Sequence, residues 1–251
     1  MDEGGANKAG RAVWRCHCRS GGAGLAARSG GTRLLVLAAG FGLCLVPPVG
    51  AAPGLTILTH ETNDTVAEDL VVMRLEGSIA APMAEAFVDG WAKWGPGHNR
   101  LVIDLDSPGG ELAETEAIVA AIARIRETAI VDTLVRHDAI CASACIAIFM
   151  QGATRLAGGS STWLFHGACH ERSNRPDLAL TDRYLDILRE AGVAADFLCL
   201  LVGRGYVTTP GKLWVSGYEL VHVFDANIIT QLLEPWRPER GRVSRPGIEP
   251  H

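Results

Sequence analysis

Cys141 to Cys145, with the sequence Cys-Ala-Ser-Ala-Cys, is the stretch on which the interpretation of this chain depends. An apolar, strand-like run (Ala129–Val135) precedes it, and an apolar run that can form a helix (Ala144–Met150) follows it. A serine between a strand and a helix can cap the helix through its hydroxyl. It can also be a nucleophile beside backbone N–H groups that bind an anion. Taken alone, the stretch favours capping by Ser143.

Two further motifs also follow strand-like runs. The turn Ser107-Pro108-Gly109-Gly110 comes directly after the apolar run Leu101–Leu105, and Phe165-His166-Gly167 closes the run Thr162–Phe165. Strands that alternate with amphipathic helices indicate parallel βαβ units. The carboxyl ends of parallel strands meet at one edge of a sheet, where ligands bind. We therefore expect these two motifs to lie beside Ser143.

The order of these motifs resembles the proteolytic subunit of the Clp protease, within the Clp/crotonase superfamily. The similarity is greatest to the secreted branch of that superfamily, in which the serine has a Ser-Ala-Cys context. It covers Leu70 to Ile229. The resemblance implies an α/β fold of Clp/crotonase-like repeated βαβ units, with a mainly parallel sheet in a single domain.

The resemblance also assigns site residues. It implies that Ser143 is the nucleophile, that His166 is the catalytic histidine, and that the amides of Gly110 and Ala144 form an oxyanion hole. The chemistry agrees, because a serine hydroxyl needs a neighbouring base and the developing oxyanion needs preorganised donors. His137 is nearer to Ser143 in sequence, but it falls in a connecting loop and is the weaker alternative.

The turn that supports the oxyanion hole would be formed by Ser107, Pro108 and Gly109. Glycine permits a close approach of the backbone to a neighbouring group. The alternative is that these residues make a simple turn between a strand and a helix.

The third member of a catalytic triad cannot be assigned. The resemblance calls for an aspartate beyond the histidine, but the comparable place, Arg204 to Tyr206, contains no acid. Asp182, Asp186 and Asp196 are more simply solvated charges on helix faces. The third residue is therefore unknown, and we predict a dyad of the serine and the histidine.

The imidazole of such a dyad still needs an acceptor for its second N–H. A backbone carbonyl or the hydroxyl of Thr208 or Thr209 could supply it. A neutral acceptor stabilises the imidazolium less than a carboxylate does, so we expect slow turnover.

Composition limits the partners. The net charge of −5 provides no basic surface for nucleic acid, which excludes that class of partner. We expect a peptide or protein substrate, no cofactor and no metal. Since related subunits assemble into rings, a homo-oligomer is also expected. An ATPase partner is not expected for an exported protein, because ATP is absent outside the cytoplasm.

The expectation of export rests on residues 34–51. The first 33 residues read as a disordered extension. The apolar run Leu34–Val46 then has the length of the hydrophobic region of a secretory signal, and small residues follow it. We therefore expect a periplasmic or secreted protein, or a membrane-anchored one where the segment is not cleaved. Residues 52–233 would form the Clp/crotonase-like domain and residues 234–251 a disordered tail.

Four cysteines would remain in the exported chain, an even number in an oxidising compartment. We favour a disulfide between Cys169 and Cys199, which would brace the loop after the histidine. The alternative, between Cys141 and Cys145, would clamp the turn at Ser143 if the two Cα atoms are close enough.

Periodicity predicts most of the remaining elements. Met83, Phe87, Trp91 and Trp94 recur at helical spacing, which predicts a helix whose aromatic stripe packs in the core. The other predicted elements are helices over Glu111–Glu127, Asp177–Ala191, Ala194–Val202 and Leu213–Leu220, and strands over Gly54–Thr59, Leu70–Leu75 and Val221–Thr230.

The leading functional hypothesis is an exported serine hydrolase that cleaves short or unfolded peptides through an acyl-enzyme on Ser143. The alternative is a catalytically weak or inactive relative that serves as a binding or assembly module. A minor hypothesis is a Ser–Lys protease, for which Lys212 is the only lysine within plausible reach. Acyl-CoA chemistry is excluded, because an exported protein does not meet CoA.

Overall fold

The structure, a computed structural model, describes residues 54–59, 70–169 and 177–233. The expected extension, the signal or anchor segment and the C-terminal tail lie outside the described residues. Within the described ranges, no helix has both the length and the apolar character needed to cross a bilayer.

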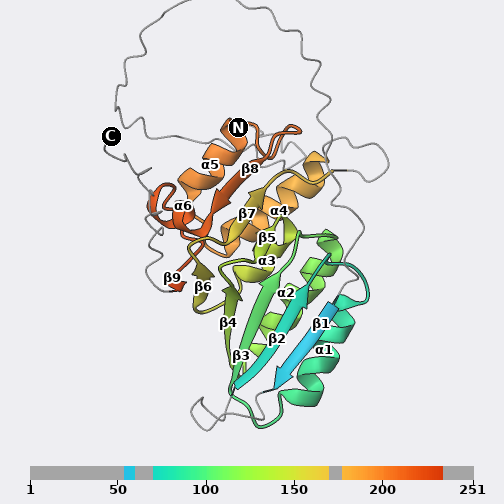
Figure 1. Cartoon of the computed structure of the whole chain (residues 1–251). Helices are drawn as coiled ribbons and strands as arrows, with labels where there is room; N and C mark the ends of the chain where they lie inside the picture. The colour runs from blue at the N-terminus through green and yellow to red at the C-terminus, as the bar shows by residue number, and fades with distance from the viewer. Residues whose placement is uncertain (1–53, 60–69, 170–176, 234–251) are drawn as a thin grey trace, which may run out of the picture. The chain divides into compact units, whose positions relative to one another are not determined.

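A six-stranded sheet forms the larger part of the fold (Figure 1). Its strands run in the order β1-β2-β3-β4-β6-β9, and all neighbours are parallel except β1 and β2. The strands are β1 (Gly54–Thr59), β2 (Leu70–Glu76), β3 (Arg100–Asp106), β4 (Ile130–Val135), β6 (Arg155–Gly158) and β9 (Gln231–Leu233). The predicted α/β class with a mainly parallel sheet is therefore confirmed.

Helices α1 (Met83–Trp94) and α2 (Leu112–Ile125) pack on one face of this sheet. Alternate residues of β2 and β3 are fully buried there, as the two-residue period of a strand requires. The predicted aromatic stripe is only partly buried. Met83 and Phe87 belong to the core, whereas Trp94 is 38% exposed because it ends the helix.

A second sheet positions the candidate site. It consists of β5 (Ile140–Ala142), β7 (Thr162–Phe165) and β8 (Leu213–Ser216), in that order. β5 is parallel to β7, and β8 is antiparallel to β7. An isolated parallel bridge between Ser107 and Cys141 joins the end of β3 to β5. The two sheets are thereby linked at the carboxyl ends of β3 and β5.

Four more helices complete the described fold: α3 (Ala144–Phe149), α4 (Leu178–Glu190), α5 (Ala195–Gly203) and α6 (Gly217–His222). Helix α3 contacts α2, α4 and β3. All six of its residues are buried. The helix that follows the Ser143 turn therefore lies inside the protein.

The structure corrects two predictions near the C-terminus. Leu213–Leu220 is not one helix but the strand β8 followed by α6, and the predicted strand Val221–Thr230 is instead the end of α6 and a turn before β9. A capping box at Ser216 and Glu219 starts α6. Its S-x-x-E pattern was the sequence signal for that boundary.

The short strands β5 and β6 were not predicted. With three and four residues, they show too little periodicity for recognition.

Candidate active site

The turn Ser107-Pro108-Gly109-Gly110 is tied to the fold by the side chain of its serine. Ser107 is 1% exposed, and its hydroxyl donates to the Gly77 carbonyl at 2.6 Å and accepts from the Gly109 amide at 3.1 Å. Gly109 has φ +93°, in the region that glycine adopts without steric cost. Ser107 and Gly109 thus hold the backbone of this turn in place.

The two glycines of this turn meet different neighbours. A Cβ on Gly109 would lie 2.8 Å from Cβ of Ser143 and 3.1 Å from the Ala144 nitrogen, so the turn packs directly on the serine. A Cβ on Gly110 would lie 2.0 Å from the Ile79 carbonyl oxygen. Neither position accommodates a larger residue without a shift of the backbone.

The N–H of Gly110 points away from the backbone of Ile79. The Ile79 amide donates to the Gly109 carbonyl, and the Ile79 carbonyl accepts from the Glu111 amide. These two hydrogen bonds make a parallel bridge between Ile79 and Gly110. In such a bridge, the N–H of the middle residue points to the opposite side. Gly110 is exposed, and its N–H has no acceptor among the described residues. This amide is therefore available to a ligand.

Ser143 has an unusual backbone conformation, with φ +54° and ψ −124°. Such a conformation is costly for a residue other than glycine and persists only when the surroundings enforce it. The Ser143 amide donates to the Leu164 carbonyl at 2.8 Å, and its carbonyl accepts from the Tyr184 hydroxyl at 2.9 Å.

The capping interpretation of Ser143 is wrong. Although Ser143 occupies the N-cap position of α3, its side chain makes no capping hydrogen bond. The amide of Ala144, the first residue of α3, also has no acceptor within the described part of the chain. The hydroxyl and the following amide are both left free for another role.

The disulfide differs from the favoured prediction. Cys141 and Cys145 are joined, with a Cα–Cα distance of 5.3 Å, whereas Cys169 and Cys199 are not in a disulfide. The strand-to-helix turn brings residues four apart within bonding range. The bridge therefore connects β5 to α3 across Ser143. It is the alternative disulfide of the sequence analysis, which would clamp the turn at Ser143.

His166 follows β7, which lies beside β5. The register pairs Ala142 with Leu164, so Ser143 and His166 both lie just beyond the carboxyl ends of neighbouring parallel strands. Nδ1 of His166 lies 2.7 Å from the Gly167 carbonyl oxygen. A carbonyl can only accept, so Nδ1 carries the proton and Nε2 of the neutral ring carries the lone pair. The ring thus has the tautomer that a general base requires.

The ring is largely buried, and this burial lowers the pKa of His166. The hydrogen bond to Gly167 opposes that shift, and the charge of Lys212 adds to it. His166 is consequently neutral at pH 7, although no hydrogen bond joins its ring to the Ser143 hydroxyl among the described residues. Catalytic hydrogen bonds are often long in unliganded enzymes and tighten with substrate.

The alternative base is placed elsewhere. Nδ1 of His137 lies 3.3 Å from the Ser160 hydroxyl, and its backbone lies against Gly158. The structure therefore pairs His137 with Ser160 and not with Ser143.

No carboxylate interacts with the His166 ring within the described ranges. Asp182 and Asp196 are exposed, and Asp186 forms an ion pair with Arg189. The hydroxyl of Thr209 donates to the Gly205 carbonyl at 2.7 Å and accepts from the Gly211 amide at 3.1 Å, and neither bond involves His166. The observed acceptor of the ring N–H is a backbone carbonyl.

Lys212, which the sequence analysis considered only for a Ser–Lys pair, lies near this ring, and its charge acts on it. The antiparallel ladder of β7 and β8 ends with Phe165 opposite Leu213, so His166 and Lys212 are the residues directly beyond its last pair. The four residues of β8 show no alternation that could have located this lysine. No contact between Lys212 and Ser143 is recorded among the described residues, so the structure does not assemble a Ser–Lys pair.

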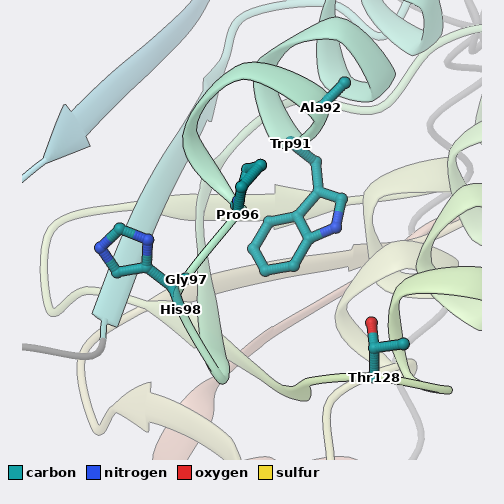
Figure 2. A pocket seen from close by; sticks show the side chains of 7 residues that line it. Trp91, Ala92, Pro96, Gly97, His98 and Thr128 are labelled. Atoms are coloured by element: carbon teal, nitrogen blue, oxygen red, sulfur yellow. The ribbon is translucent and has the colours of Figure 1, made fainter.

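A shallow cavity of about 300 Å³ lies away from this region, where α1 ends. Figure 2 shows Trp91, Pro96 and His98 along it, with Thr128 on the far side. Within the described residues, no group of three His, Cys, Asp or Glu side chains could hold a metal ion.

The comparisons identify the fold. No family model matches the chain, and no curated protein matches it. The structure is similar to the ClpP protease catalytic domain from Plasmodium falciparum, with 16% identity, a TM-score of 0.52, and coverage of 69% of this chain and 89% of that one. The chain has a Clp protease-like fold. The predicted fold resemblance is thereby confirmed.

A ClpP1 point mutant from Listeria monocytogenes is also similar, with 18% identity and a TM-score of 0.49. The match covers 65% of this chain and 91% of that one.

Proposed function

We propose that this chain is an exported serine hydrolase, a peptidase that acts on short or unfolded peptides. The main support is the conformation of Ser143, a strained residue whose hydroxyl does not cap the helix that it precedes. Strain of this kind is concentrated at functional sites. A nucleophilic serine at a sharp strand-to-helix turn is also a recurrent arrangement in hydrolases.

The reaction follows from the placement of the groups. Nε2 of His166 takes the proton of the Ser143 hydroxyl as Oγ attacks the substrate carbonyl carbon. The amides of Gly110 and Ala144 hold the oxyanion, and His166 returns the proton to the leaving amine. Water then attacks the acyl-enzyme with the same base, which releases the acid and regenerates Ser143.

The proposed partners follow from the fold and from export. The substrate is a peptide or an unfolded protein, no ATP-driven partner participates, and copies of the chain assemble into a homo-oligomer. The periplasm or the extracellular space is the proposed location, and the Cys141–Cys145 disulfide suits an oxidising compartment.

A second candidate function is a binding or assembly module with weak or no catalysis. The absence of a carboxylate at the His166 ring, within the described residues, favours it. A buried ring without a counter-charge stabilises the imidazolium poorly, and loss of the triad acid costs about 10⁴-fold in rate elsewhere.

Labelling with a fluorophosphonate separates the two functions. Wild type should react at Ser143, while Ser143→Ala and His166→Ala should not, with circular dichroism confirming that both variants fold. Peptide mapping of the adduct identifies the modified serine. Wild-type protein that stays unlabelled while folded would favour the binding module.

A further inference from the structure

Lys212 and His166 lie at the same end of the second sheet. The antiparallel ladder of β7 and β8 ends with Phe165 opposite Leu213, and His166 and Lys212 are the residues directly beyond this last pair. Residues opposite each other in an antiparallel pair are close neighbours. The two residues are therefore near enough for the ammonium charge to act on the imidazole.

Lys212 supplies a positive charge near the His166 ring. Within the described part of the chain it forms no ion pair with a carboxylate. The Asp177 carboxylate, on the element that follows the histidine loop, accepts a hydrogen bond from the Leu180 amide instead. The lysine is thus available to an external anion.

Two other polar groups of the described residues contact the backbone of Ser143 and Gly167. The hydroxyl of Tyr184 donates to the Ser143 carbonyl, and burial raises the pKa of Tyr184 so that it stays protonated. The Cys169 thiol contacts the Gly167 carbonyl. Burial lowers the pKa of His166, and among the described residues Lys212 is the charged side chain that lowers it further.

This charge opposes the proposed reaction. His166 must become an imidazolium when it takes the Ser143 proton, and a nearby ammonium group disfavours that second positive charge. A bound carboxylate at Lys212 would offset the ammonium charge at the moment of proton transfer. Substrate binding would then supply a negative charge that the described residues lack at this place.

We propose that Lys212 binds a carboxylate of the substrate beside the scissile bond, so that the enzyme selects anionic peptides. This inference rests on the proposed acyl transfer at Ser143. Trp214, which is 55% exposed in the adjoining strand β8, offers an apolar surface to the chain that bears the carboxylate. The selection acts on the rate of acylation as well as on binding.

The first test compares two peptidyl diphenyl phosphonates that differ only in a P1 glutamate or glutamine. Wild type should react at Ser143 about tenfold faster with the acidic reagent, as a charge-assisted contact implies. Lys212→Gln should bring the ratio of the two labelling rates close to one. The control is Lys93→Gln, which replaces a lysine that lies over the Trp94 ring and should leave the ratio unchanged. Equal rates in wild type, or a preference that survives Lys212→Gln, would overturn the proposal.

The second test needs no turnover. An NMR titration of His166 should give a higher pKa in Lys212→Gln than in wild type. In wild type the pKa should also rise on adding N-acetylglutamine, which has only a chain-end carboxylate, or N-acetylglutamic acid α-amide, which has only a side-chain one. N-acetylglutaminamide is the uncharged control. The acid that raises the pKa of His166 shows whether Lys212 binds a chain-end or a side-chain carboxylate.

The two tests separate the two ideas. If neither phosphonate modifies Ser143, the hydrolase function fails, while the titration still decides whether Lys212 binds a carboxylate. A His166 pKa that both acids leave unchanged in wild type would overturn the carboxylate site, even where the neutral phosphonate labels Ser143.

Discussion

The hydroxyl of Tyr184 on α4 donates a hydrogen bond to the carbonyl oxygen of Ser143, at 2.9 Å. Tyr184 is 4% exposed, and burial raises the pKa of its hydroxyl, so the group is a permanent donor. The bond ties α4 to a serine whose φ is +54°. A helix more than forty residues further along the chain thus helps to hold the strained turn.

Tyr184→Phe should slow fluorophosphonate labelling of Ser143. It should also lower the free energy of unfolding by about 1 kcal/mol, because the Ser143 carbonyl loses one of two hydrogen bonds and keeps the one from the Ile146 amide. Labelling kinetics and urea denaturation measure the two effects. Tyr206→Phe is the matched control, since the Tyr206 hydroxyl has no hydrogen bond among the described residues. Equal labelling rates in wild type and Tyr184→Phe would show that the bond does not position the serine.

Removal of the Cys141–Cys145 disulfide should loosen the same turn. The double variant Cys141→Ala/Cys145→Ala should lose about 2 kcal/mol of stability, the entropic value for so short a loop, and should label more slowly. Mass spectrometry of the non-reduced peptide that contains both cysteines establishes the bond. The variant Cys199→Ala, in α5, is the control and should retain the wild-type labelling rate. A bond found between Cys169 and Cys199 would contradict the structure.

Gly110→Ala should strongly reduce labelling. A Cβ at this position would lie 2.0 Å from the Ile79 carbonyl oxygen, so the backbone must move and the Gly110 amide with it. Loss of one oxyanion donor costs about 10²–10³-fold in rate. Gly203→Ala, where a Cβ has no neighbour within 4 Å, is the control and should leave labelling unchanged. Full activity in a folded Gly110→Ala protein would exclude this amide from the oxyanion hole.

Neutralising the aspartates beyond the histidine should have little effect. Asp182→Asn, Asp186→Asn and Asp196→Asn should each keep hydrolysis within a few-fold of wild type, against about 10⁴-fold for a true triad acid. Peptide hydrolysis by each purified variant tests this. If one of them loses activity without unfolding, that aspartate is the missing third member.

The buried carboxyl of Asp104 should make stability depend on pH. Burial raises its pKa from 3.8 to about 6, with Arg74 opposing and Asp106 adding to the shift. The native state then binds the proton more tightly than the unfolded state, so this contribution favours the native state below pH 4 and is lost as the pH rises through 6. Relative to Asp104→Asn, wild type should lose about 3 kcal/mol of unfolding free energy from below pH 4 to pH 7.

Urea denaturation of wild type and Asp104→Asn across this pH range gives the difference directly. If the unfolding free energy of wild type instead increases relative to that of Asp104→Asn as the pH rises, the native state does not raise the pKa of Asp104. Attraction to Arg136, whose Nε lies 3.2 Å from the Asp104 carboxylate, would then dominate over burial.

The sequence by itself determined the fold class and the order of the site motifs. Strong apolar periodicity predicted α1, α2 and β2 to within a few residues, and the run Thr162–Phe165 has the bounds of β7. These signals are local, because a strand or helix that faces the core repeats its apolar residues at a fixed period. The placement of His166 at a strand end followed from the same reasoning, whereas β5, the three-residue strand that ends before Ser143, was not predicted.

Tertiary structure decided what local patterns do not contain. The strained φ of Ser143, its bond to Tyr184 and the Cys141–Cys145 bridge all depend on contacts between separate elements. Lys212 comes near His166 because β8 pairs with β7 up to Phe165 and Leu213, and that register is set by side-chain packing across the sheet. Distance along the chain does not report such a pairing, so the sequence alone did not place this lysine beside the histidine.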